Sequence, residues 1–183
     1  MAFDFLHSTH RETPVLIPRI GLELLVRVPP QATGGILTSI ETTNAPGFGP
    51  PLHRHRETEI FYVLDGCYLF QVDDKRITAH IGDVVIAPGG AAHTFVNITD
   101  KPARQFIQIL PGLDALAFFL GLGEVMRDCT LDQNALKAFG KAWQVEFLGP
   151  PLKIDRTCGS TQANDAFTAA PRDRAACAEL STK

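Results

Sequence analysis

Two histidines one residue apart, followed by a glutamate, constrain this chain more than any other feature. They are His53, His55 and Glu59, within the segment 47–66. Because side chains of a strand alternate between its two faces, His53 and His55 are expected on the same face. Glu59 follows four residues after His55 and can return to that face. Two imidazoles and a carboxylate that converge on one point are a metal site that lacks one ligand.

The missing ligand is predicted in the segment 82–97. A strand-like run over 83–87 ends there in a Pro/Gly turn that would present His93. We therefore expect one metal ion per chain, held by His53, His55, Glu59 and His93. Three neutral imidazoles and one carboxylate suit a divalent transition ion such as Mn, Fe, Co, Ni, Cu or Zn, whereas calcium and magnesium prefer oxygen ligands.

Both segments resemble the two motifs of the cupin family. The first motif, G-x5-H-x-H-x3–4-E-x6-G, is matched by Gly47, His53, His55, Glu59 and Gly66. The second, G-x5-P-x-G-x2-H-x3-N, is matched by Gly82, Pro88, Gly90, His93 and Asn97. More narrowly, the segments 59–66 and 145–152 resemble single-domain, quercetin dioxygenase-like proteins. The resemblance implies a mainly β fold, a single cupin barrel of the double-stranded β-helix, jelly-roll-like kind.

Short apolar runs between Gly/Pro turns also predict a barrel of two sheets. The strands are expected at 15–17, 22–28, 36–43, 60–64, 67–72, 83–87 and 105–110. Helical spacing then predicts a short C-terminal helical extension, with helices over 113–126 and 131–142. We expect these helices to pack on the barrel as part of its core, with a lid function as the alternative. We expect one domain made of an N-terminal arm and strands (1–35), a barrel core (36–112), helices (113–152) and a tail (153–183).

Strand alternation also predicts side chains around a substrate pocket. Phe61 and Val63 share the inward face of Glu59, and Phe95 shares that of His93. Phe48, in the Pro/Gly-rich loop before the histidines, either lines the pocket mouth or caps the barrel. The three remaining histidines are interpreted as surface residues: His80 on a surface strand, and His7 and His10 on a solvated N-terminal arm.

Composition excludes several classes of partner. The 183 residues are 45% hydrophobic and 20% charged, which is typical of a soluble globular protein. A net charge of −3 gives no reason to expect nucleic acid or an anionic membrane as partner. No uninterrupted apolar run is long enough to span a bilayer, and we recognise no signal peptide. Four separated cysteines without a C-x-x-C pair favour free thiols, hence a reducing cytoplasm.

The apolar strands between residues 15 and 28 suggest a homodimer, because an exposed strand edge invites pairing with another chain. The resemblance points the same way, since in small cupins such strands often pair with a partner subunit. We expect these strands to cover or extend the sheet of a second copy.

For the activity, the resemblance implies an oxidoreductase of the dioxygenase type. The substrate would be a small aromatic or enolisable oxygenated compound, as in quercetinase-like proteins, and Glu59 would be the catalytic base as well as a ligand. A metal-dependent isomerase or cyclase, a small-molecule-binding cupin without turnover, and a metal that only braces the strands remain alternatives. The cupin fold alone does not choose among them.

Overall fold

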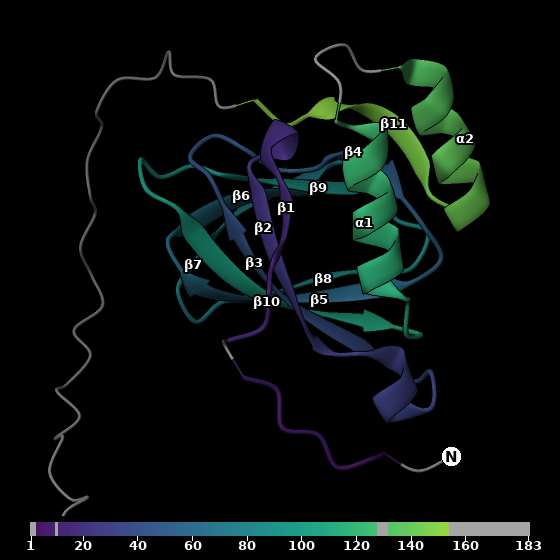
Figure 1. Ribbon diagram of the computed structural model, residues 1–183. Helices are drawn as coiled ribbons and strands as arrows, with labels where there is room; N and C mark the ends of the chain where they lie inside the picture. The colour runs from purple at the N-terminus through teal and green to yellow at the C-terminus, as the bar shows by residue number, and fades with distance from the viewer. Residues whose placement is uncertain (1–2, 10, 128–131, 154–183) are drawn as a thin grey trace, which may run out of the picture.

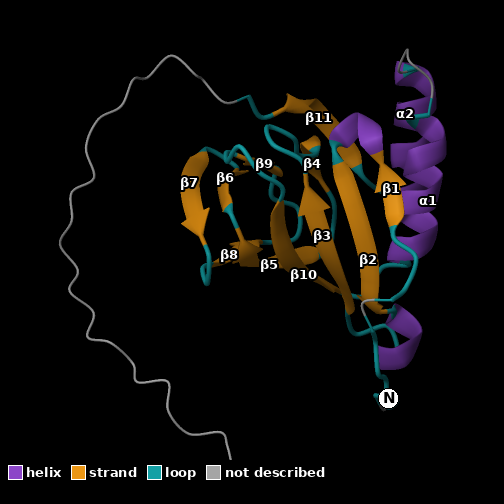
Figure 2. Cartoon of the chain, turned by 60° about the vertical axis from the view of Figure 1, so that its left-hand side comes forward, coloured by secondary structure: helices purple, strands orange, loops and turns teal. Residues whose placement is uncertain are grey.

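The computed structural model describes residues 3–9, 11–127 and 132–153, and within them two antiparallel sheets face each other across one core (Figures 1 and 2). The six-stranded sheet has the order β1 (Val15–Ile17), β2 (Leu22–Val28), β3 (Thr38–Asn44), β10 (Ala103–Leu110), β5 (Thr58–Asp65) and β8 (Val84–Ala87). The five-stranded sheet has the order β11 (Glu146–Pro151), β4 (Pro51–Arg54), β9 (His93–Asn97), β6 (Cys67–Val72) and β7 (Lys75–His80). Short 3-10 turns at Pro18–Ile20 and Pro30–Thr33 complete the N-terminal part. The predicted mainly β barrel is confirmed.

Two helices cover one side of the barrel. Helix α1 (Ala115–Val125) lies beside β1 and β2, and α2 (Gln133–Trp143) lies beside β11 (Figures 1 and 2). Asp114 begins α1 by accepting a hydrogen bond from the Ala117 amide, and Asp132 begins α2 in the same way. The bounds of both helices agree with the predicted ranges to within two residues. Neither helix in the described part of the chain is long and apolar enough to cross a membrane.

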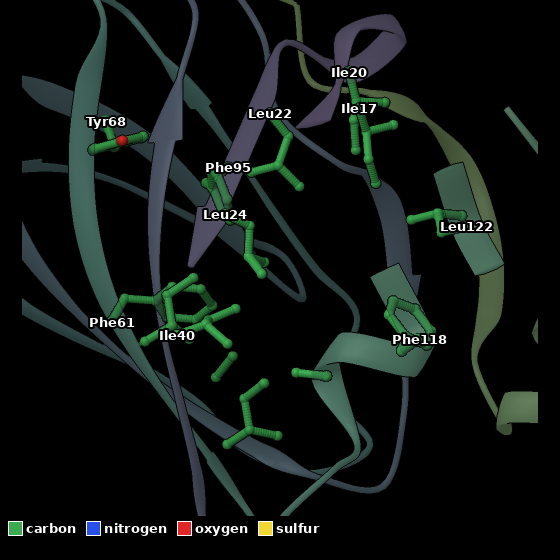
Figure 3. Packing of buried hydrophobic residues seen from close by; sticks show 14 of the residues in the cluster. Ile17, Ile20, Leu22, Leu24, Ile40, Phe61, Tyr68, Phe95, Phe118 and Leu122 are labelled. Atoms are coloured by element: carbon green, nitrogen blue, oxygen red, sulfur yellow. The ribbon is translucent and has the colours of Figure 1, made fainter. Parts of the chain in front are cut away.

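The core is continuous from the barrel interior to α1. Leu24, Ile40 and Phe61 of the barrel are almost fully buried, and Phe118 and Leu122 of α1 belong to the same cluster (Figure 3). Each buried aliphatic or aromatic side chain contributes on the order of 1.5–3 kcal/mol to folding. The helices are therefore part of the domain's core rather than an appendage.

The strand expected over 36–43 is shorter, because a threonine takes the backbone groups of its first residues. Thr33 Oγ1 donates to the Leu37 carbonyl at 2.6 Å and accepts from the Leu37 amide at 3.1 Å. Leu37 therefore cannot use those groups in the sheet, and β3 begins at Thr38. Ile36, the first residue of the expected strand, lies outside β3 and is 40% exposed.

The sequence analysis missed strand β11. We interpreted Gly149-Pro150-Pro151 as the end of the helical region, whereas these residues pair with β4. Two register shifts accompany the pairing, and β11 lies at the edge of its sheet. Proline lacks an amide donor and is tolerated on edge strands and at bulges, so the motif is compatible with this position.

The N-terminal strands extend the sheet of their own chain. β2 pairs with β3 on one side and with β1 on the other, so β1 is the edge strand of the six-stranded sheet. The edge open to a second copy is therefore that of β1. Several predicted features lie outside the described residues: the tail beyond residue 153, His10, Leu131 and the cysteines at 129, 158 and 177. Within the described residues, Cys67 is a free thiol.

Candidate metal centre

The four predicted ligands come from both sheets and meet inside the barrel. His53 of β4 pairs directly with His93 of β9 in the five-stranded sheet, and His55 follows one residue after β4 ends. Glu59 lies on β5 of the opposite sheet, between Ile109 and Ala87. The tight turn after β8 supports this arrangement, because the Gly90 amide donates to the His55 carbonyl at 2.7 Å. Gly90 has a φ of 85°, a conformation that glycine adopts without strain.

The distances within this group match a single small ion. One ring nitrogen from each of His53, His55 and His93 lies within 4.8 Å of the others. Glu59 lies between two of the rings, with Oε2 3.2 Å from His93 Nε2 and Oε1 3.7 Å from His55 Nε2. The four side chains are called the His–Glu cluster below. The three imidazole nitrogens form the group within this limit, and the Glu59 carboxylate adds an oxygen donor beside two of the rings. Such a donor set suits a divalent transition metal ion.

Backbone carbonyls hold two of the rings so that one nitrogen stays available. His53 Nδ1 lies 2.8 Å from the Pro51 carbonyl oxygen, and His93 Nδ1 lies 3.0 Å from that of Ala91. A carbonyl only accepts, so each Nδ1 carries the proton and donates it, which directs Nε2 into the site. Such outer contacts are the usual means of orienting metal-binding histidines.

Glu57 supplies a similar neighbour to the third ring. Its Oε2 lies 3.2 Å from His55 Nδ1, although the contact does not have hydrogen-bond geometry and this buried nitrogen has no hydrogen bond within the described residues. Glu57 is itself buried and accepts a hydrogen bond from Arg56 Nε at 2.8 Å. We did not single out Glu57 from the sequence, because it lies in the bend between β4 and β5, where strand alternation does not predict the direction of a side chain.

Burial and neighbouring charges shift the pKa values of three members of the cluster in different directions. Burial, together with repulsion from His93, lowers the pKa of His53 from 6.5 to about 3. Burial alone would raise the pKa of Glu59, but the hydrogen bond with His93 and the nearby imidazoles outweigh it and lower this pKa from 4.5 to about 2. Burial likewise opposes protonation of His93, yet the Glu59 carboxylate raises its pKa. His53 is thus neutral and Glu59 ionised at neutral pH, as metal ligands need to be.

An apolar cavity of about 90 Å³ extends from the His–Glu cluster to the helices. Its polar lining residues are Thr42, Asn44, His53, His55, Glu57 and Glu59. The apolar wall comes from three parts of the chain: Ile20 and Leu22 near the N-terminus, the barrel strands, and the helical region with Phe118, Trp143 and Phe147. A metal bound by the cluster would therefore face a space closed by hydrocarbon.

Of the four predicted pocket residues, only Phe95 lines this cavity. Phe61 and Val63 point inward as expected but are buried in the packing, with the Phe61 ring against Phe70 and Phe95. Phe48 is 42% exposed and lies against Gly21, where an added Cβ would come within 2.6 Å of the phenylalanine ring. Strand parity identifies an inward side chain but does not distinguish the cavity wall from the core behind it.

The sequence contains a pattern that could have indicated the helical part of the cavity wall. Phe118 and Leu122 are spaced i, i+4 and form one apolar stripe of α1. We assigned that stripe to core packing, and it does pack in the core, but the same residues also line the cavity. His80, by contrast, lies exposed on β7 as predicted, with Nδ1 3.4 Å from Cys67 Sγ.

Comparison with known proteins agrees with this arrangement. Residues 41–107 match the family model described as the cupin domain. The chain is 36% identical over 95 residues to gentisate 1,2 dioxygenase 1 of Aquipseudomonas alcaligenes, a match that covers 46% of this chain and 26% of the relative. The chain therefore corresponds to about a quarter of that enzyme's length.

Solved structures show the same fold at low sequence identity. KdgF from Halomonas sp. superposes with a TM-score of 0.52 at 17% identity, covering 63% of this chain and 98% of that one. An RmlC-like cupin from Shewanella frigidimarina gives a TM-score of 0.50 at 19% identity, covering 61% and 91%. The fold of this chain is accordingly that of a cupin β-barrel.

Proposed function

We propose that this chain binds one divalent transition metal ion in the His–Glu cluster and oxidises a small oxygenated compound in a dioxygenase-type reaction. The observation that carries the proposal is that three imidazoles and one carboxylate converge at the inner end of an apolar cavity. A site that only braced the strands would not need a cavity beside it. Mn, Fe, Co, Ni, Cu and Zn all accept this donor set.

Four protein ligands leave one or two positions open on a five- or six-coordinate ion. When bound, such an ion supplies a Lewis acid that lowers the pKa of a coordinated substrate hydroxyl. Glu59 Oε2 lies 3.2 Å from His93 Nε2 within the cluster, so its carboxylate is placed to accept the proton that the substrate releases. The apolar walls exclude water, which strengthens these electrostatic interactions.

The match with gentisate 1,2 dioxygenase 1 supports oxygen chemistry as the reaction type, although it spans only a quarter of that enzyme. The narrower quercetin dioxygenase-like resemblance rests on the segments 59–66 and 145–152. The cavity, at about 90 Å³, is smaller than the roughly 150 Å³ of an apolar cavity that accepts benzene. A single ring therefore enters only as the partly buried Phe119, Trp143 or Phe147 rotates, and single-ring phenols and diketones are better first substrates than flavonols.

Oxygen consumption tests the proposal directly. Protein reconstituted separately with each candidate ion is supplied with catechols, hydroquinones and diketones in an oxygen electrode, and we expect substrate-dependent uptake with at least one ion. Product formation without oxygen uptake would instead indicate an isomerase or cyclase, and binding without product would indicate a carrier.

The role of Glu59 is tested separately with Glu59→Gln. An amide oxygen still coordinates but does not accept the proton, so we expect turnover to fall by about 100-fold or more while metal content changes little. Equal turnover of the variant and the wild type at matched metal occupancy would remove the base role.

A further inference from the structure

Histidines of the cluster are the basic side chains in the described lining of the cavity beside it. No lysine or arginine is among its lining residues in the part of the chain that the structure describes. The two carboxylates in its wall, Glu57 and Glu59, are both at the cluster end. Beyond them, Ile40 and Ile107 of the barrel and Leu22 of β2 face the space.

Charges at the cluster end are nearly balanced without a second anion from a ligand. Glu57 is paired with Arg56, whose side chain is 66% exposed and lies outside the cavity lining. Glu59 neutralises one of the two charges of a divalent ion. One anionic oxygen of a ligand neutralises the other, or leaves a single positive charge at the cluster end once Glu59 has taken the proton. In either state a carboxylate at the far end of the cavity has no cationic side chain beside it.

The rest of the cavity cannot provide a counter-charge for such a carboxylate. Burying a carboxylate among aliphatic and aromatic side chains costs several kcal/mol when no partner compensates it. Thr42, Asn44 and Trp143 are the wall residues away from the cluster with polar side-chain groups, and none of them carries a charge. The Thr42 hydroxyl already donates to Asn44 Oδ1 at 3.3 Å. A buried carboxylate in this region would be left without a cation.

We propose that the ligand of this cavity is a neutral molecule with one ionisable, oxygen-bearing end and a hydrocarbon remainder, and that a carboxylate at the far end prevents binding. This inference rests on the proposed function in one respect: the oxygen-bearing end of the ligand binds at the metal ion, so the remainder lies in the apolar part of the cavity. It separates the chain from the relative whose name includes gentisate, a ring with a carboxylate. Selection against acids follows from the wall residues, not from the metal ligands.

A matched pair of catechols tests the inference. Protocatechuate carries its carboxylate across the ring from the hydroxyls, and in its acetyl analogue a methyl group replaces the charged oxygen. Both are titrated calorimetrically into zinc-loaded protein, because zinc has no redox chemistry and binding is then measured without turnover. Trp143 is the chain's one tryptophan and lines the cavity, so quenching of its fluorescence shows whether the ligand occupies this space.

We expect the acetyl analogue to bind and to quench Trp143, with protocatechuate at least about tenfold weaker. A charge added at the rim should reverse this order. In Phe119→Lys, at a partly buried cavity residue, protocatechuate should gain affinity, whereas in Phe119→Gln it should not.

Two results would overturn the inference: equal or tighter binding of protocatechuate to the wild type, or no binding of the acetyl analogue. Neither result involves oxygen. A failure of the dioxygenase proposal, seen as absent oxygen uptake, is therefore distinguishable from a failure of this one.

Discussion

His53 and His93 both turn Nδ1 toward a backbone carbonyl two residues earlier in the chain, at Pro51 and Ala91. The same local geometry thus sets the tautomer of two ligands from different strands. Without a metal ion, His93 also donates from Nε2 to Glu59, and loss of that proton frees the nitrogen for an ion. At the residue scale, backbone carbonyls therefore orient two of the four proposed ligands.

Acid should destabilise the metal-free protein through His53 and Glu59. The folded pKa of His53 is about 3 against 6.5, so below pH 6.5 the unfolded chain binds the extra proton and stability falls toward pH 3. The folded pKa of Glu59 is about 2 against 4.5, so its contribution is present above pH 4.5 and is lost as pH falls toward 2. The raised pKa of His93 acts in the opposite direction, contributing below 6.5 and losing effect as pH rises through its folded pKa.

Urea unfolding of chelator-treated protein measures this dependence. We expect the free energy of unfolding to decrease steadily from pH 6.5 to about 4. In His53→Gln, which does not titrate, the slope over this interval should be shallower. A wild-type stability that is flat across the interval would contradict the assigned protonation states.

At the element scale, the sequence predicted the start of a helix well where one capping residue determines that start. Asp114 and Asp132 begin the two helices, and the predicted ranges around them are correct to within two residues. β11 was missed because its Gly-Pro-Pro motif is a turn signal, and only pairing with β4 makes it a strand. Thr33 shortened β3 by a side-chain interaction that strand periodicity does not reveal.

Two helix glycines give opposite predictions at this scale. At Gly140 of α2, an added Cβ would lie 2.4 Å from the Val145 carbonyl oxygen, so Gly140→Ala should destabilise the fold by about 1–3 kcal/mol. At Gly123 of α1, the nearest atom is Ile17 Cγ1 at 3.7 Å, so Gly123→Ala should stabilise the fold by about 0.5–1 kcal/mol. Thermal unfolding compares the two variants, and a Gly140→Ala protein as stable as Gly123→Ala would contradict the close approach of α2 to the backbone at Val145.

At the scale of the whole molecule, spacing in the sequence identified the barrel and predicted four side chains that lie near one another in it. The cavity wall was not predictable in the same way. It joins Leu22, barrel residues and Trp143, which are far apart in the chain and become neighbours only when the helices cover the barrel. Periodicity reports which face of an element is apolar, not which other element lies opposite.

The homodimer stays a prediction, now confined to one edge. Because β2 is paired on both sides, a second copy would contact the free edge of β1, where Leu16 is 60% exposed. We expect a dimer in sedimentation equilibrium at micromolar concentration, and Leu16→Lys should weaken it by placing a charge at the edge. Ile81→Lys, at a residue 64% exposed in a turn, is the matched control and should leave the dimer intact. A wild-type monomer would refute the prediction.

The central claim is that the His–Glu cluster binds a metal ion, and metal content tests it most directly. Elemental analysis of purified protein, dialysed after loading with each candidate ion, should give about one equivalent per chain for the wild type. His80→Ala, which removes an exposed histidine of β7, should retain that equivalent, whereas the double variant His53→Ala/His55→Ala should retain almost none. Metal content unchanged in the double variant would contradict the account.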